Sequence, residues 1–291
     1  MRELFMSNVA GRAGRALLSA SRIILSNKYI LAGFMIVLVF VLMAVLADFI
    51  APYSPIEIVG PALQPPSQKY LMGTDNLGRD VFSRIIYGSR VVLLTTAIAI
   101  ALSGAIGTLL GLISGYIGGA LDRVFSFIMD SIYAFPSLIL AIALSVALGP
   151  SPINAAIAIA VVYIPTYFRM VRGQVLSIKN EPYIEIARAL GIPSTRIVTR
   201  HILPHVGRTL MVVFSMNSAD AILTEAALSF IGLTVQPPQP DWGFDLYKGR
   251  GFILTGYWWM MVFPGFCITL LAVGFALISE GVSTVISGGK R

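Results

Sequence analysis

The chain contains few of the residues that redox or acid–base chemistry would need. Of its 291 residues only 12% are charged, two are histidines and one, Cys267, is a cysteine. A single thiol cannot form an intramolecular disulfide, and we expect Cys267 to be a small buried apolar residue. His201 and His205 have the spacing of a metal-binding pair, but Pro204 lies between them and no third ligand is evident. We therefore expect structural roles for both histidines and no metal site.

Two further absences narrow the function. The sequence contains no Gly-x-x-x-x-Gly-Lys-Ser/Thr motif, so it offers no phosphate-binding loop for a nucleotide. A hydrolase acting inside a membrane would need a nucleophile and a base within the apolar part of the chain, and both histidines lie outside that part. We expect no catalytic residue in this chain.

What the chain has in abundance is apolar sequence, since hydrophobic residues make up 56% of it. A hydrocarbon core about 30 Å thick takes about 20 helical residues to cross, and apolar runs of that kind recur along the chain. They are residues 30–50, 91–114, 125–148, 153–171, 209–231 and 257–279. Because helices satisfy their own backbone polar groups and the runs lack the alternation of barrel strands, we predict an all-α bundle of six transmembrane helices.

The Lys and Arg residues indicate the orientation, because cytoplasmic loops carry an excess of them. With six spans both termini fall on one side, and that side holds 15 of the 21 Lys and Arg residues. We therefore place both termini, and the long loop between the fourth and fifth spans, in the cytoplasm. The net charge of +7 follows from this bias, with some attraction to membrane lipid, so nucleic acid is not an expected partner. The first run exceeds the apolar part of a signal peptide and is expected to stay as a signal-anchor helix.

The connection over residues 51–90 is expected to be external. Its prolines at 52, 55, 61, 65 and 66 favour an extended chain. Further on, Asp80 is a candidate N-cap for a short surface helix over residues 81–87.

The second span carries small residues at a spacing of four, which places them along one stripe of a helix. They are Ala99, Ser103, Gly107, Gly111 and Gly115. Small side chains let two helices approach closely in lipid, so this helix is expected to be central and tightly packed. Prolines at 136, 165 and 264 fall within the third, fourth and sixth spans, where each permits a kink.

The fifth span contains the most polar groups. Asn217, Asp220, Thr224 and Glu225 share one broad face of a helix, and Asp130 in the third span is a further candidate for the same surface. Each acid in the hydrocarbon costs about 3 kcal/mol unless it is paired or in contact with water. Two interpretations remain open: the polar face lines a water-filled passage, or the acids form ion pairs that hold helices together.

The loop between the fourth and fifth spans predicts a helix-turn-helix. Pro182 begins a short amphipathic helix whose apolar positions are Ile184, Ala187 and Leu190, and Gly191 is its expected C-terminal cap. A second helix is predicted over residues 194–202, ended by Pro204. Such a loop either lies on the lipid surface or offers a docking site to a soluble partner.

Several segments resemble the membrane subunits of ABC importers. Glu185-Ile186-Ala187, then Gly191 and His201-Ile202-Leu203-Pro204, resemble the EAA loop, which receives the ATPase through a short coupling helix. Ile186 and His201 depart from the general pattern, where alanine and isoleucine are usual. Residues 71–90, 134–137 and 225–233, with the Pro-Pro and Trp-Gly pairs at 237–238 and 242–243, are similar to the C-type permease of dipeptide and oligopeptide importers. The family often continues past its last helix with a basic tail, which this chain does not match.

The resemblance implies a type I importer permease with a cytoplasmic tail over residues 1–28, a first helix and external segment over 29–90, and a core over 91–291. The coupling loop would lie at about residues 172–208. Docking to the ATPase would involve Tyr183, Glu185, Ala187, Arg188, Leu190 and Gly191. The passage would be lined or braced by Asn217, Asp220, Thr224 and Glu225.

The resemblance also implies the partners and the location. They would be a second homologous permease subunit, two cytoplasmic ATPase subunits that hold ATP and Mg, and an external substrate-binding protein, so this chain itself would bind no cofactor. The site of action would be the inner membrane of a prokaryotic cell. Di- or oligopeptides are the expected substrates, and nickel chelates, glutathione and oligosaccharides are alternatives for the same machinery. An ion-coupled secondary transporter is the alternative of another class.

Overall fold

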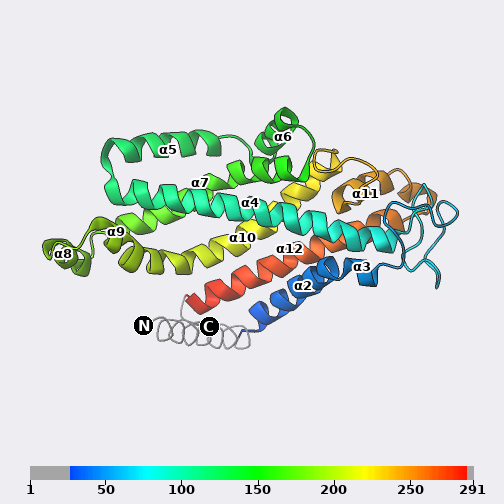
Figure 1. The fold of residues 1–291 in the computed structure, drawn as a ribbon, viewed down its shortest axis with the longest axis horizontal. Helices are drawn as coiled ribbons and strands as arrows, with labels where there is room; N and C mark the ends of the chain where they lie inside the picture. Colours follow the sequence, from blue (N-terminus) through cyan, green and yellow to red (C-terminus); the bar gives the residue numbers. More distant parts are fainter. Residues whose placement is uncertain (1–26, 287–291) are drawn as a thin grey trace, which may run out of the picture.

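The computed structural model describes residues 27–286, which fold into long helices lying side by side (Figure 1). The only strand-like pairing in this part of the chain is an isolated bridge between Thr74 and Asp80. The elements are α2 (Lys28–Val45), α3 (Ala47–Ile50), α4 (Val81–Ile117), α5 (Gly119–Tyr133), α6 (Ser137–Leu148), α7 (Pro152–Ile178), α8 (Pro182–Ala189), α9 (Ser194–Ile197), η1 (Val198–Ile202), α10 (Leu203–Phe230), α11 (Trp242–Gly249), η2 (Ile253–Thr255) and α12 (Trp259–Ile286). Most of the predicted N-terminal tail and the last two basic residues lie outside the described part.

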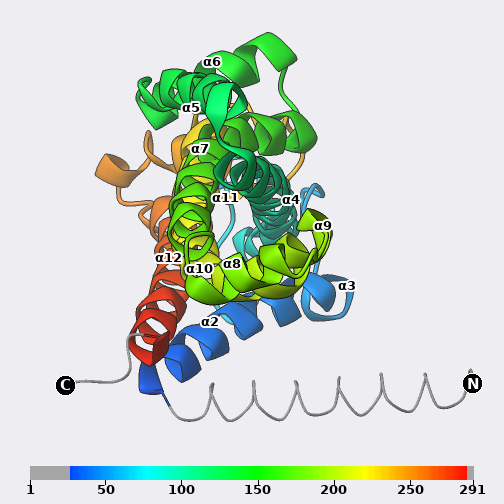
Figure 2. The same ribbon diagram turned by 90° about the vertical axis from the view of Figure 1, so that its left-hand side faces the viewer.

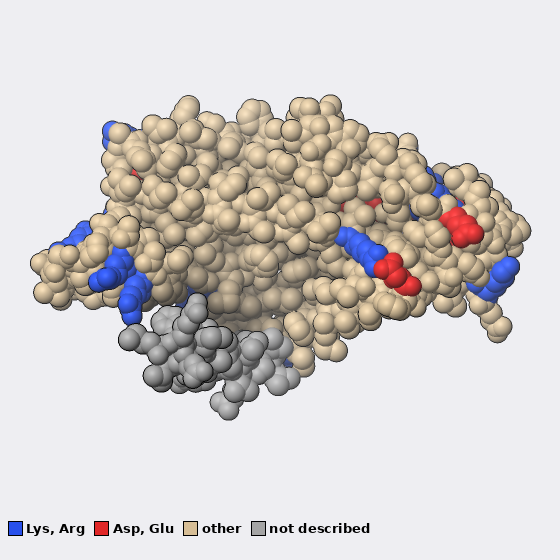
Figure 3. All heavy atoms as spheres, viewed as in Figure 1, with Lys and Arg blue, Asp and Glu red and all other residues tan. Residues whose placement is uncertain are grey.

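Four of the described helices, α2, α4, α7 and α12, are long and apolar enough to cross a membrane, and the pair α5–α6 would make a fifth crossing. The fifth predicted span corresponds to α10. Its 28 residues are long enough to cross a membrane, but its polar side chains make it less apolar than the four helices named above. It packs against α12, α4 and α7. On the face shown in Figure 3, charged side chains gather toward the two ends and leave a broad uncharged band between them. The prediction of an all-α membrane bundle is confirmed.

The third predicted span, residues 125–148, is not one helix. It is broken into α5 and α6, whose axes are bent by 92°. Pro136 lies at the break as the N-cap of α6, where its missing N–H prevents the helix from continuing. Pro165 and Pro264, in contrast, lie inside the continuous helices α7 and α12. In both Figure 1 and Figure 2, α5 and α6 lie on one side of the bundle and α2 on the opposite side.

The short surface helix predicted over residues 81–87 is wrong as a separate element, because it is the first part of the 37-residue helix α4. Its N-cap is confirmed: the Asp80 carboxylate accepts a hydrogen bond from the backbone N–H of Ser83 at 2.8 Å. Gly88 is too weak a helix breaker to end the helix between the two parts. At about 55 Å, α4 is far longer than a hydrocarbon core of about 30 Å, so a part of it must extend beyond the core.

The small-residue stripe of α4 faces α7. A Cβ on Gly107 would lie 2.6 Å from the Tyr167 Cβ, and a Cβ on Gly111 would lie 2.9 Å from the carbonyl oxygen of Phe168. A Cβ on Gly115 would lie 2.8 Å from the Cβ of Val175. These distances are shorter than any real Cβ contact, so glycine is what lets the two backbones approach this closely.

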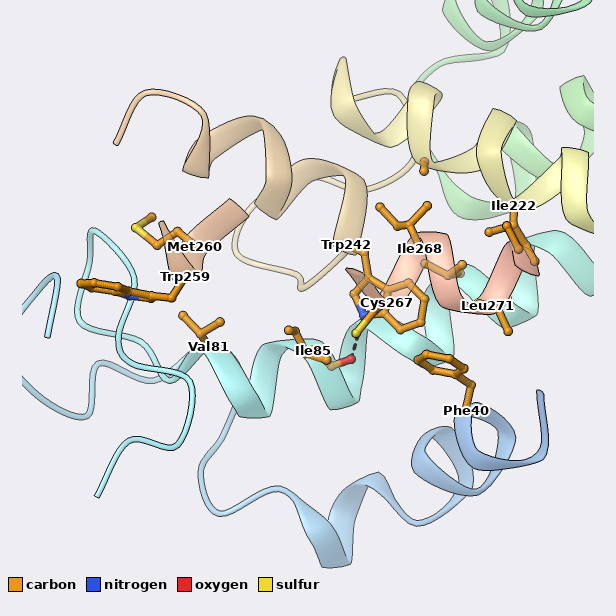
Figure 4. Packing of buried hydrophobic residues seen from close by; sticks show 13 residues of the cluster. Phe40, Val81, Ile85, Ile222, Trp242, Trp259, Met260, Cys267, Ile268 and Leu271 are labelled. Atoms are coloured by element: carbon orange, nitrogen blue, oxygen red, sulfur yellow. Dashed lines mark hydrogen bonds between the residues drawn. The ribbon is translucent and has the colours of Figure 1, made fainter. Parts of the chain in front are cut away.

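A buried cluster joins α2, α4, α10, α11 and α12 (Figure 4). Trp242 is fully buried, donates its indole N–H to the carbonyl oxygen of Ile85 at 2.9 Å, and packs edge-on against Phe40. Cys267 lies in this cluster as the small buried residue that was expected. The guanidinium of Arg84 pairs with Asp245 at 2.6 Å and donates to the backbone carbonyl of Pro55, which ties the segment between α3 and α4 to α4 and α11.

Candidate coupling helix and polar hollow

The predicted amphipathic helix is α8, which lies at the end of the molecule farthest from the external segment (Figure 1). Pro182 occupies the first turn, where a missing N–H costs nothing. Ile184 and Ala187 are buried in a cluster with residues of α4, α7 and α10. These contacts hold one face of α8 against the bundle.

The end of α8 is a Schellman motif centred on Gly191, as the sequence predicts. Gly191 has a φ of +76°, its N–H donates to the carbonyl of Arg188 at 2.9 Å, and the N–H of Ile192 donates to the carbonyl of Ala187 at 3.1 Å. A glycine adopts this left-handed conformation without the penalty that a Cβ brings. The motif ends α8 abruptly and turns the chain toward α9.

The outer face of α8 is exposed and partly apolar. Glu185 and Arg188 are exposed, and Ile186 and Leu190 are exposed by 60% and 75%. The prediction that Leu190 shares the buried face is wrong: it is the C-cap, with non-helical ψ, and its side chain points away from the bundle. Tyr183 is 41% exposed and its ring stacks on His205. Of the six predicted docking residues, Ala187 is therefore an anchor, Gly191 forms the turn, and the other four face outward.

The second predicted helix does not end at Pro204. It consists of α9, a π-helical turn η1 and then α10, which follow one another without a break. The N–H of Leu203 donates to the carbonyl of Val198, five residues back, and this wider turn accommodates the proline in the first turn of α10. Consequently α8 is joined through one Gly191 turn to a helical path that runs directly into α10. Within the described residues, no three His, Cys, Asp or Glu side chains are grouped to hold a metal ion.

A hollow of about 740 Å³ lies along α10, and we call it the α10 hollow. Its walls come from α5, α6, α7 and α10, with polar side chains Tyr133, Ser137, Tyr163, Thr166, Asn217, Asp220 and Thr224 among apolar ones. Three of the predicted passage residues, Asn217, Asp220 and Thr224, therefore share this surface. Tyr163 and Thr224 are joined by a hydrogen bond of 3.1 Å between their hydroxyl groups.

Asp130 and Glu225 do not line the α10 hollow. Asp130 forms an ion pair of 3.2 Å with Arg169, whose guanidinium lies 3.7 Å from the centroid of the Tyr133 ring at the hollow's wall. Glu225 is fully buried and faces the chain before α11, where it lies close to Asp241. The face that the four α10 residues were predicted to share is thus divided, because Glu225 points to the other side of the helix.

The buried acid pair of Glu225 and Asp241 was not predictable from spacing along one helix. Asp241 caps α11 by accepting from the N–H of Gly243 at 2.9 Å, and it accepts a hydrogen bond from the Ser229 hydroxyl. Burial raises the pKa of Asp241. Within residues 27–286 neither carboxyl group takes part in an ion pair, and two neighbouring buried carboxyl groups cannot both be ionised at low cost.

Sequence reasoning also missed an ion pair at the end of the bundle that carries α8. The guanidinium of Arg172 on α7 donates to both carboxylate oxygens of Asp122 on α5, at 2.5 and 2.7 Å, and the hydroxyl of Ser114 on α4 also donates to Asp122. Lys179 donates to the carbonyl of Gly115 at 2.8 Å. Both basic residues were counted in the charge bias of the sequence, and here they also hold α4, α5 and α7 together. The close approach of α4 and α7 at the glycine stripe is the feature that brings these groups into reach.

The chain is similar in sequence to known proteins. Residues 107–286 match the model of the family described as binding-protein-dependent transport system inner membrane component, and residues 18–71 match the N-terminal TM domain of oligopeptide transport permease C. The chain is 42% identical over 258 residues to the dipeptide transport system permease protein DppC of Alkalihalophilus pseudofirmus, covering 88% of this chain and 84% of that one. It is 40% identical over 260 residues to the probable D,D-dipeptide transport system permease protein DdpC of Escherichia coli, covering 88% and 87%.

The fold has a solved counterpart as well. A chain of the inward-facing MetNI methionine ABC transporter superposes with a TM-score of 0.56 at 21% identity, covering 72% of this chain and 97% of that one. The fold and the helical loop between α7 and α10 define a multi-pass membrane protein with the architecture of an ABC transporter permease. The chain belongs to the family of binding-protein-dependent transport system inner membrane components.

Proposed function

We propose that this chain is a non-catalytic membrane subunit of an ATP-driven importer and forms one wall of the pathway through which peptides enter the cell. One observation carries the proposal: α8 presents an exposed face at one end of the bundle and is connected by α9 and η1 to α10, whose side lines the α10 hollow. Peptides are the proposed substrates because the relatives at 40% and 42% identity are named for dipeptide transport.

In the proposed mechanism an ATPase subunit binds the exposed face of α8. Its movement on binding ATP displaces α8, and the displacement reaches α10 because the intervening turn is short and hydrogen-bonded. Ile184 and Ala187 tie α8 to the bundle, so the force acts on packed helices rather than on a loose loop. Rotation or translation of α10 then changes the side on which the α10 hollow opens.

The proposed docking surface consists of Tyr183, Glu185, Arg188 and Leu190, with Ala187 and Gly191 holding its shape. The exposed apolar side chains of Ile186 and Leu190 support this assignment, since water-exposed apolar groups beside charged ones are typical of an interface with another protein. ATP and Mg would be held by the two partner ATPases, and this chain would bind neither.

The remaining partners follow from the two ends of the bundle. We place the chain in the inner membrane of a prokaryotic cell. In accord with the charge bias, both termini and α8 then lie on the cytoplasmic side. The external segment and α11 then face the external substrate-binding protein. A second homologous permease subunit would close the open side of the α10 hollow, with Asn217, Asp220 and Thr224 along the pathway, Asp130 near its rim and Glu225 as a brace.

Reconstitution tests the proposal. The chain is purified with its partner permease and ATPases, placed in proteoliposomes with the binding protein, and uptake of labelled dialanine is followed with and without ATP. We expect uptake that requires ATP and all of the subunits. Uptake by the isolated chain, driven by a proton gradient alone, would instead establish a secondary transporter. Uptake of nickel chelates, glutathione or oligosaccharides in preference to peptides would change the substrate and leave the mechanism intact.

A further inference from the structure

The α10 hollow has an unbalanced charge. Among the described residues that line it, Asp220 is the one acid, and no Lys, Arg or His lines it. Asp220 is exposed to the hollow, and within residues 27–286 it takes part in no ion pair. Both other acids close to α5 and α7, Asp122 and Asp130, are paired with arginines. Asp220 thus differs from its neighbours in having no cation from the described part of its own chain.

The groups around Asp220 can accept hydrogen bonds but leave its carboxylate unbonded. The Thr224 hydroxyl donates to the backbone carbonyl of Asp220 at 2.9 Å, so its proton is not available to the carboxylate. The Tyr163 hydroxyl is engaged with Thr224 at 3.1 Å. Asn217 lies about one turn earlier on α10 and also lines the hollow. The result is a carboxylate that shares one wall with the hydroxyl groups of Tyr163 and Thr224 and with the side chain of Asn217.

This arrangement fits a primary ammonium group. An ammonium has a positive charge and three N–H donors, which require a carboxylate and two further acceptors. Surrounding apolar side chains, such as Val213 and Leu223, lower the local dielectric and strengthen the attraction. A metal ion is a poorer match because one carboxylate without a second acidic or histidine ligand is too small a donor set.

We propose that Asp220, together with Asn217, Tyr163 and Thr224, forms a subsite that binds a primary ammonium group of the substrate in transit. The inference rests on the proposed function, since it assumes that the α10 hollow is part of a pathway. The ammonium can come from the N-terminus of a peptide or from a lysine side chain. The same wall disfavours a carboxylate, so the subsite orients a zwitterionic peptide with its amino end toward α10.

The first experiment measures the electric potential in the hollow and does not require transport. Thr166 on the α7 wall is replaced by cysteine in a Cys267→Ser background, and the permease complex in detergent is labelled with a cationic and an anionic methanethiosulfonate reagent. We expect the cationic reagent to react faster, and Asp220→Asn to lower the rate ratio several-fold. Glu280→Gln, which removes an exposed acid of α12, is the matched control and should leave the ratio unchanged.

The second experiment identifies the ligand group by protection of the same cysteine. Dialanine and the amide of Nα-acetyl-lysine each carry one primary ammonium, from the two sources, whereas N-acetyl-dialanine carries none. We expect the first two to slow labelling and the third not to, and Asp220→Asn to weaken protection by about tenfold, the effect of losing one charge-assisted hydrogen bond. Asp220→Glu should retain most of it. Protection by dialanine alone would restrict the subsite to the peptide N-terminus.

Two outcomes would overturn the inference. Equal protection by N-acetyl-dialanine would mean that the ammonium is not recognised. The second outcome has two parts: Asp220→Asn leaves the ratio of cationic to anionic labelling rates unchanged, and the second permease subunit is lost from the purified complex. Together they would mean that Asp220 forms an ion pair with that subunit. Failure of the proposed function is distinguishable, because the wild-type complex would then show no ATP-dependent uptake while both cysteine assays still report on the hollow.

Discussion

Replacing Gly191 by alanine tests whether the turn after α8 is a rigid joint. Gly191 has a φ of +76°, and a Cβ added there would meet no atom within 4 Å. The cost of Gly191→Ala is therefore purely conformational, about 1–2 kcal/mol for an L-residue in the left-handed region. That energy opposes the two hydrogen bonds that close the Schellman motif. The equilibrium between the closed and open turn should move by a factor of roughly 5 to 30.

Gly173→Ala is the matched control. Gly173 lies inside α7, and a Cβ there also meets no atom within 4 Å, but its φ is not positive. Alanine is favoured over glycine inside a helix by about 0.5–1 kcal/mol, so this variant should be as stable as the wild type or slightly more so.

Hydrogen exchange followed by mass spectrometry, on the assembled complex in detergent, measures the effect locally. Peptides covering residues 182–192 should exchange roughly 5 to 30 times faster in Gly191→Ala than in the wild type, in proportion to the open fraction. The same peptides should be unchanged in Gly173→Ala. If α8 exchanges equally in all three proteins, the Schellman motif does not hold the joint and the reasoning is refuted. Coupling, measured as substrate imported per ATP hydrolysed, should fall in parallel with the exchange.

Three other variants test separate parts of the account. Glu185→Lys should reduce ATP-driven uptake while the protein stays membrane-inserted. Glu280→Lys, the same charge change at an exposed residue of α12, should not, and equal uptake in both variants would contradict docking through α8. Gly107→Ala places a Cβ 2.6 Å from the Cβ of Tyr167 and should lower the free energy of unfolding by about 1–3 kcal/mol, measured by thermal unfolding. Gly104→Ala is the control and should be tolerated, because the nearest atom to its Cβ lies at 3.6 Å. Burial raises the pKa of Asp241 above 3.8, so the folded state holds its proton more tightly and the stability falls as the pH rises past that value. Asp241→Asn should therefore make the melting temperature fall less steeply as the pH is raised from about 4, and an unchanged slope would argue against this.

Local patterns predicted the parts of the fold that depend on local physics. Apolar runs located the membrane helices, the Asp80 cap located the start of α4, and Gly191 located the end of α8. Each of these signals is set by a backbone requirement within a few residues: a length that crosses lipid, an N–H that needs an acceptor, or a positive φ. For this reason these signals can be used when the tertiary structure is unknown.

Breaks and continuations between elements were predicted less well, because proline has different effects in different places. Pro136 ends a helix, Pro165 and Pro264 lie inside helices, and Pro204 is accommodated by a π turn. Which outcome occurs depends on whether neighbouring helices or a wider turn satisfy the freed carbonyl group. A sequence window does not contain those neighbours.

The candidate site was also predicted only in part. Asn217, Asp220 and Thr224 were predicted to share a surface, and helical spacing was enough to find it. Helical spacing also placed Glu225 on this broad face, but Glu225 lies close to Asp241, beyond the end of α10, on the other side of the helix. Glu225 and Asp241 come together only when the loop before α11 is folded. Helical periodicity does not predict the path of that loop.

In the proposed mechanism, force from another polypeptide enters this chain through α8. A photo-crosslinking amino acid at position 183, on the exposed face of α8, tests it directly in native membranes. We expect a covalent adduct with an ATP-hydrolysing subunit, and its yield should change when ATP is bound. An adduct with lipid alone, or none with any ATPase while the assembled transporter still imports substrate, would contradict it.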